Sequence, residues 1–71
     1  MMFDYTKLRE RIIKTFGNYE EFAERVGCTL NHITNVLNNE RELTRGNISE
    51  WALVLSVPAD EIESYFFTER R

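Results

Sequence analysis

Apolar residues recur at helical spacing along the whole chain, and no segment alternates apolar and polar positions as a half-buried strand would. The first segment carries an apolar stripe at positions Tyr5, Leu8, Ile12 and Phe16. This stripe predicts a helix over about residues 4–16, in which Asp4 or Thr6 caps the start and Gly17 follows the end. An all-α fold is therefore expected.

The next two predicted helices are short and follow each other closely. Asn18 and Glu21 have the spacing of a capping box, which predicts a helix over about residues 19–26. Gly27 is placed for the left-handed conformation that ends this helix, and Thr29 caps another over residues 30–37. Two short helices joined by a tight turn that contains glycine are typical of a helix-turn-helix.

Two further helices are expected after a polar loop. Asn47 and Glu50 repeat the capping-box spacing and predict a fourth helix over about residues 48–56. Pro58 suits the start of a fifth helix over about residues 59–65, which would bury Ile62 and Phe66. The predicted architecture is a compact five-helix domain.

The length of 71 residues leaves room for one domain, so we expect residues 1–71 to fold as a single unit. Cys28 is the only cysteine, which excludes an internal disulfide and a multi-cysteine zinc site, and we expect it to be a small buried spacer. No apolar run approaches the ~20 residues that span a bilayer, and the N-terminal residues are too charged for a signal peptide. A cytoplasmic protein is expected.

The formal net charge of −3 argues at first against a nucleic-acid partner, because DNA binding neutralises phosphates with Lys and Arg. The distribution of charge matters more than its sum. The segment between Gly27 and Glu40 contains no Asp, Glu, Lys or Arg. A carboxylate there would repel phosphate oxygens, so its absence fits a surface that faces DNA.

The segment YEEFAERVGCTLNHITNVLNN, from Tyr19 to Asn39, resembles the helix-turn-helix of the lambda-repressor-like family, the Xre or Cro-type regulators of phages and bacteria. Ala23, Gly27 and Ile33 hold the spacing of that family. They provide a small residue where helices cross, a residue that permits the turn, and a core residue beneath the recognition helix. The opening MFDYTKLRERI and the closing EIESYFF are similar to small repressor-like proteins of phages and prophages of Gram-positive bacteria.

The resemblance implies that the third helix enters the major groove of an operator while the second spans the DNA backbone. It assigns base contacts to Thr29, Leu30, Asn31, Thr34 and Asn35. Their chemistry agrees, because Asn can bond adenine in bidentate fashion and Leu or Thr methyl groups can meet a thymine methyl group. Some preference for A·T pairs is expected; the alternative is that these residues form an ordinary polar surface.

By the same resemblance, phosphate contacts come from the start of the second helix and from the end of the third helix with its loop. The residues at these places are Asn18, Tyr19, Asn38, Asn39 and Arg41. Arg45, Lys14 and Lys7 could extend the track, although the stripe of Lys7, Arg11 and Lys14 is also typical of a solvated helix face. So few cations predict a shallow salt dependence, with ~3–4 phosphates contacted per protomer.

Three positions depart from the pattern of the family. Tyr19 stands where many members have Gln, and Asn39 replaces the usual Gly, which the left-handed tolerance of Asn permits. Leu37 replaces a Glu that pairs with an Arg of the first helix. We expect Ile12 or Ile13 to meet Leu37 instead, because an apolar substitute for a buried ion pair can be neutral or stabilising.

Three consecutive aromatic residues, Tyr65, Phe66 and Phe67, cannot all face inward from one short helix, so we expect them to provide a dimer contact. His32 is the only histidine and is expected near the DNA surface or in solvent. The sequence holds no nucleophile and base pair, no glycine-rich phosphate loop and no metal ligand set. We therefore expect no enzyme activity, cofactor, metal or small-molecule ligand.

These observations predict a sequence-specific regulator that binds double-stranded operator DNA as a homodimer, in the cytoplasm at the nucleoid. The alternative is a protein-interaction module with the same fold, such as an antirepressor or a docking subunit. The acidic net charge, the C-terminal aromatic residues and the glutamates at positions 20, 21 and 24 favour that alternative, because an acidic surface repels DNA.

Overall fold

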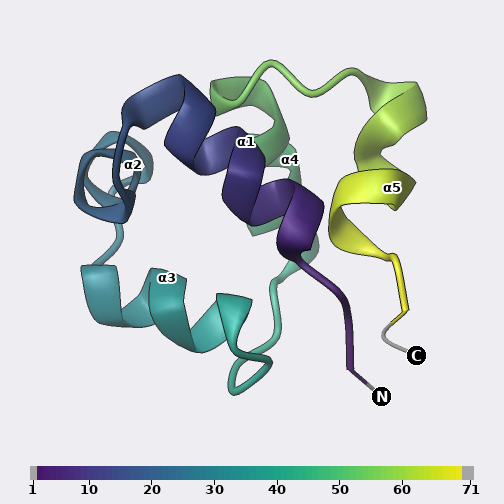
Figure 1. Cartoon of the computed structure of the whole chain (residues 1–71), viewed down its shortest axis with the longest axis horizontal. Coiled ribbons are helices and arrows are strands. Elements are labelled where there is room, and N and C mark those ends of the chain that lie inside the picture. The colour runs from purple at the N-terminus through teal and green to yellow at the C-terminus, as the bar shows by residue number, and fades with distance from the viewer. Residues whose placement is uncertain (1, 70–71) are drawn as a thin grey trace.

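Five α-helices and one short 3₁₀ helix form the chain in a computed structural model, which describes residues 2–69 (Figure 1). The elements are α1 (Thr6–Phe16), α2 (Tyr19–Val26), α3 (Leu30–Leu37), α4 (Arg45–Val54), η1 (Ala59–Glu61) and α5 (Ile62–Phe66). Within residues 2–69 there is no strand, only an isolated antiparallel bridge between Phe3 and Glu69. The predicted all-α class with five helices is confirmed.

The predicted starts of the second and third helices are confirmed together with their caps. Oδ1 of Asn18 accepts a hydrogen bond from the backbone N–H of Glu21 at 2.8 Å, and Oγ1 of Thr29 accepts one from His32 at 3.1 Å. These bonds satisfy N–H groups that have no partner inside the helix. Helix α1 begins at Thr6, two residues after the predicted start. Oδ1 of Asp4 accepts a hydrogen bond from the backbone N–H of Thr6 at 3.0 Å.

The predicted start of the fourth helix is wrong by three residues. Oγ1 of Thr44 accepts a hydrogen bond from the N–H of Asn47 at 3.1 Å, so Thr44 is the cap and α4 begins at Arg45. The predicted fifth helix is divided, because η1 precedes α5 and only the latter is α-helical. Neither change moves α2 or α3.

Three helices end in the same backbone motif, in which the residue at the turn adopts a left-handed conformation. The turn residues and their φ angles are Gly27 at 74°, Asn39 at 61° and Ser56 at 56°. The next residue in each case donates its N–H to a carbonyl five residues earlier: Cys28 to Ala23, Glu40 to Asn35, and Val57 to Ala52. This pattern is a Schellman motif, and it satisfies the last carbonyl groups of each helix.

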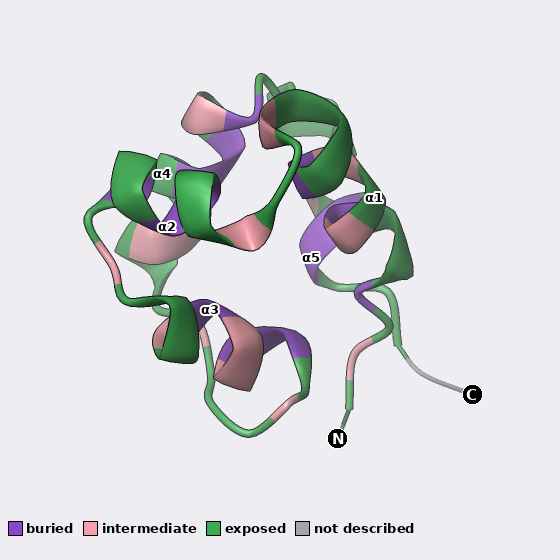
Figure 2. Cartoon of the chain, turned by 60° about the vertical axis from the view of Figure 1, so that its left-hand side comes forward, coloured by how far each residue is buried: buried purple, intermediate pink, exposed green. Residues whose placement is uncertain are grey.

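All five α-helices contribute to one core (Figure 2). The largest fully buried side chains are Trp51 and Phe22, whose rings meet edge to face with centroids 4.9 Å apart. Ile33 is fully buried on the inner face of α3 and Ala23 is nearly fully buried, as their spacing predicted. Cys28, which was expected to be buried, is only half-buried. Across residues 2–69, no helix is long and apolar enough to cross a membrane.

Candidate nucleic-acid interface

Helix α3 lies at one edge of the molecule and is connected to α2 by the turn at Gly27 (Figure 1). Its inner face is formed by Ile33, Val36 and Leu37, which are all buried. A Cβ added at Gly27 would meet nothing within 4 Å, so glycine is favoured here by the φ of 74° rather than by crowding. The core therefore fixes which face of α3 points outward.

The residues predicted to contact bases lie on or beside the outward face of α3. Thr29, Leu30 and Asn31 are exposed, and Thr34 and Asn35 are half-buried. Two hydroxyl groups of this set are engaged locally, because that of Thr29 caps the helix and that of Thr34 donates to the Asn31 carbonyl at 3.1 Å. The side-chain amides of Asn31 and Asn35 each offer donors and an acceptor on this face.

The residues predicted to contact phosphate at the start of α2 differ in exposure. Asn18 is exposed, and its Oδ1 is used as the helix cap, so its amide nitrogen is the group left to donate outward. Tyr19 is half-buried and packs against the core. Figure 1 shows this end of α2 beside the end of α1.

At the end of α3, Arg9 of α1 binds Asn38, which is predicted to contact phosphate. Its Nη2 donates to the backbone oxygen of Leu37 at 2.9 Å and to Oδ1 of Asn38 at 3.0 Å. The Oδ1 of Asn38 is thereby used, and its amide nitrogen is the group left to donate. Leu37 and Ile12 are both buried in the core, whereas Ile13 is 44% exposed, so Ile12 is the one of the two isoleucines that can meet Leu37 there. Sequence reasoning missed Arg9, because a backbone carbonyl leaves no signal in the sequence.

Asn39 has a partner that the sequence did not indicate. Its Oδ1 accepts from the N–H of Phe3 at 2.8 Å, and its Nδ2 donates to the Phe3 carbonyl at 2.9 Å. The side chain therefore binds the N-terminal backbone rather than facing outward. Asn39 is therefore not placed to contact phosphate, contrary to the prediction.

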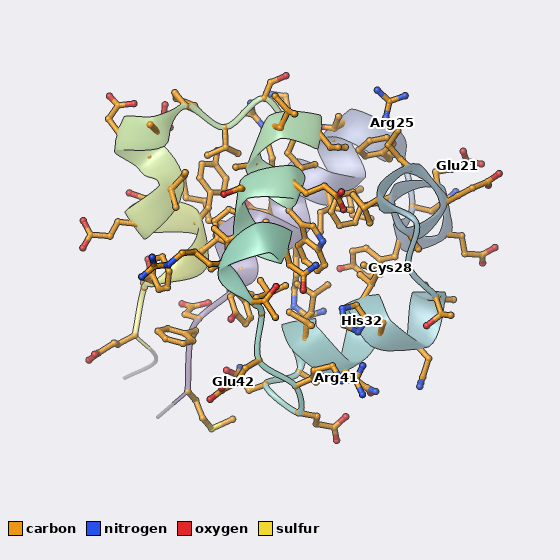
Figure 3. The ribbon with its side chains drawn as sticks, turned by 180° about the vertical axis from the view of Figure 1, so that it is seen from behind. Glu21, Arg25, Cys28, His32, Arg41 and Glu42 are labelled. Atoms are coloured by element: carbon orange, nitrogen blue, oxygen red, sulfur yellow. The ribbon has the colours of Figure 1, made fainter. Side chains whose placement is uncertain are left out.

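Arg41 lies in the loop after α3, beside His32 (Figure 3). Its Nη1 is 3.0 Å from Nδ1 of the imidazole. A guanidinium group only donates hydrogen bonds, so Nδ1 is the acceptor in this contact. Arg41 is exposed and His32 is half-buried. The pair places a cation next to the otherwise uncharged α3. After Arg9, His32 is the second residue near the site that the sequence did not predict as part of it.

Two cations of the stripe formed by Lys7, Arg11 and Lys14 are used within the protein. Arg11 donates from Nε to the Leu55 carbonyl and from Nη2 to the Ser56 carbonyl, both at 2.9 Å. Lys7 places its Nζ 4.6 Å from the centroid of the Tyr65 ring. Both residues thus stabilise the packing of α1 against the segment after α4 and against α5.

The C-terminal aromatic residues do not form a single exposed patch. Tyr65 and Phe66 are 7% and 1% exposed and belong to the core, so the expectation that they contact a second protomer is wrong for both. Phe67 is 45% exposed, and its ring meets the ring of Phe3 edge to face, with centroids 6.0 Å apart. Only Phe67 of the three is placed to contact a partner.

The fold and these surfaces define a small all-α domain in which two short helices, joined by a tight turn, present an uncharged polar helix face. The sequence matches, over residues 1–69, the family described as a protein of unknown function, DUF739, and the chain belongs to that family. No curated protein matched it. In the part of the chain that the structure describes, no three His, Cys, Asp or Glu side chains gather as metal ligands.

Proposed function

We propose that the chain is a sequence-specific transcriptional regulator of Cro or repressor type, which inserts α3 into the major groove of double-stranded DNA. One observation carries the proposal: α3 follows a tight turn, is anchored by a buried inner face, and presents an outer face without any carboxylate. An α-helix fits the major groove, and its first residues reach the base edges there.

The chemistry of the outer face supports direct readout of bases. The amides of Asn31 and Asn35 can each donate to N7 and accept from N6 of adenine, and the exposed Leu30 can meet a thymine methyl group. We therefore propose an operator with A·T pairs at the positions that these residues face.

Contacts to the DNA backbone would come from the start of α2 and from the end of α3. Asn18 and Tyr19 lie where α2 begins, and Asn38 and Arg41 lie where α3 ends. Arg41 is the cation among these four residues, and Glu40 and Glu42 flank it. Few counterions would be released on binding, so the affinity should depend only weakly on salt concentration.

The biological form would be a homodimer on a palindromic operator, with recognition helices about 34 Å apart. Phe67 is the C-terminal aromatic residue placed to reach a second copy. Such a regulator acts in the cytoplasm at the nucleoid, and its occupancy of the operator would be set by its concentration. The resemblance to small phage and prophage regulators supports the same assignment.

Selection of duplexes from a random library, with the purified protein at low salt, tests the proposal. We expect enrichment of a palindrome whose half-sites lie about one helical turn apart. The variants N31A and N35A should each lose about tenfold or more in affinity for the selected duplex, because a bidentate base contact is removed. N47A, on α4, is the matched control and should bind as the wild type does.

The competing function is a protein-interaction module. Glu20, Glu21 and Glu24 are all exposed on α2, and they give this side of the helix pair a negative charge. If the folded protein enriches no duplex at micromolar concentration, or if N31A and N35A bind a selected duplex as tightly as the wild type does, the DNA-binding proposal fails and the module is favoured. A stoichiometric protein partner would then be sought.

A further inference from the structure

The N-terminal strap, defined as residues 2–4, is bound by one side chain of the turn that follows α3. The amide of Asn39 pairs with both backbone groups of Phe3, at 2.8 and 2.9 Å. It thus occupies the place that a neighbouring strand would take beside Phe3. The contact joins segments that are 36 residues apart in the sequence. We call these two hydrogen bonds the Asn39 clasp.

The C-terminal segment holds the other side of the strap. The N–H of Asp4 donates to the Thr68 carbonyl at 2.7 Å, and Phe3 forms the isolated antiparallel bridge with Glu69. The first and last parts of the described residues 2–69 accordingly lie on the same side of the molecule (Figure 1). The strap is therefore fixed to the body of the protein, and through the clasp it can hold the turn after α3.

The backbone alone does not explain why asparagine stands at this turn. Gly27 occupies the equivalent position at the end of α2, where glycine adopts the left-handed conformation without steric cost. Ser56 occupies it at the end of α4. Asparagine tolerates the same conformation less well than glycine, so what it adds at position 39 is the side-chain amide. That amide is used in the clasp.

We propose that Asn39 is a positioning residue, which fixes the turn between α3 and α4 so that Asn38 and Arg41 meet the DNA backbone together with α3. This inference rests on the proposed function. Arg41 follows Asn39 by two residues, so a rotation of the turn displaces its guanidinium group relative to α3. Asn38 directly precedes the turn and is also held by Arg9 at 3.0 Å, so the effect of the clasp is expected mainly at Arg41. Asn39 itself makes no contact with DNA.

The variant N39G tests this role, with S56G as its control. Glycine keeps the left-handed turn and removes only the side-chain amide. S56G makes the same kind of change, at the same position of the same helix-ending motif, and the Ser56 carbonyl that binds Arg11 is retained. Both variants also increase the entropy of the unfolded chain, so this general effect is common to the two.

Two measurements are made on each variant. Amide hydrogen exchange at Phe3 and Glu40 reports on the clasp and on the turn without any DNA. The affinity for a duplex selected with the wild type, measured over a series of salt concentrations, reports on phosphate contacts. In N39G we expect about fivefold to tenfold faster exchange at both amides and a similar loss of affinity, as two hydrogen bonds are removed. The slope of log affinity against log salt should fall by about 0.9, as Arg41 leaves its phosphate.

A merely structural role for Asn39 would lower stability in N39G but leave the salt slope unchanged, and this result overturns the proposal. Unchanged exchange at Phe3 and Glu40 also overturns it, as does an equal loss of affinity in S56G. If the wild type selects no duplex, the proposed function fails. Faster exchange in N39G then still supports the clasp as the element that fixes this turn, so the two failures are distinguishable.

Discussion

Nη2 of Arg9 lies 2.9 Å from the carbonyl oxygen of Leu37, so a cation of α1 neutralises the negative end of α3. The family that the sequence resembles places a glutamate at the position of Leu37, paired with an arginine of the first helix. Here Arg9 binds the backbone of α3, and Leu37 is buried. The same connection between helices is thus made without a buried carboxylate.

Removal of this guanidinium should destabilise the fold. We expect R9M, which keeps the apolar part of the side chain, to lower the free energy of unfolding by about 1–2 kcal/mol, because charged hydrogen bonds to Leu37 and Asn38 are lost. Urea denaturation followed by Trp51 fluorescence measures this. K14M is the control, since Lys14 is exposed, and equal effects of the two substitutions would contradict the role of Arg9.

Arg41 should contribute a phosphate contact that does not depend on the DNA sequence. We expect R41M to weaken binding to specific and random duplexes by a similar factor and to reduce the salt slope by about 0.9. H32A should weaken binding less, because it removes only the acceptor that orients the guanidinium at 3.0 Å. In R41M the further change H32A should have little effect. Additive losses in the double variant would mean that the two residues act separately.

Local signals allowed the sequence to predict the helices near the site. The caps Asn18 and Thr29 and the turn residue Gly27 act within a few residues of their own position, and all three have the predicted roles. The predicted start of the fourth helix is three residues too late, because Thr44 and Asn47 are both good caps and only the folded chain selects Thr44.

The long-range contacts of the site could not be predicted in the same way. Asn39 is suited both to a phosphate contact and to a helix end, and the backbone of Phe3 that binds it has no residue-specific signal. The aromatic residues at the C-terminus presented a related problem. Helical geometry requires one of them to be exposed, but only the packing of α5 on α1 identifies it as Phe67.

Dimer formation should depend on Phe67 and not on its two aromatic neighbours. Tyr65 and Phe66 belong to the core, so a truncation that removes them would unfold the chain. We expect F67S to remain folded and to shift the mass measured by light scattering from dimer toward monomer. L53S is the control, because Leu53 is 81% exposed on α4 and is equally apolar. A dimer that persists in F67S but dissociates in L53S would place the interface on α4.

Stability should decrease in alkaline solution through Tyr5. Burial of its side chain raises the pKa above 10.0, and the nearby charge of Glu42 raises it further. Above pH 10 the unfolded chain loses this proton while the folded chain keeps it, so the free energy of unfolding falls as the pH rises toward the folded pKa. Unfolding of the wild type and Y5F between pH 9 and pH 11 measures the effect, and the decrease should be smaller in Y5F. The variant E42Q should lie between the two, because it removes the charge and leaves the burial. Equal decreases in the wild type and Y5F would show that other groups cause the alkaline instability.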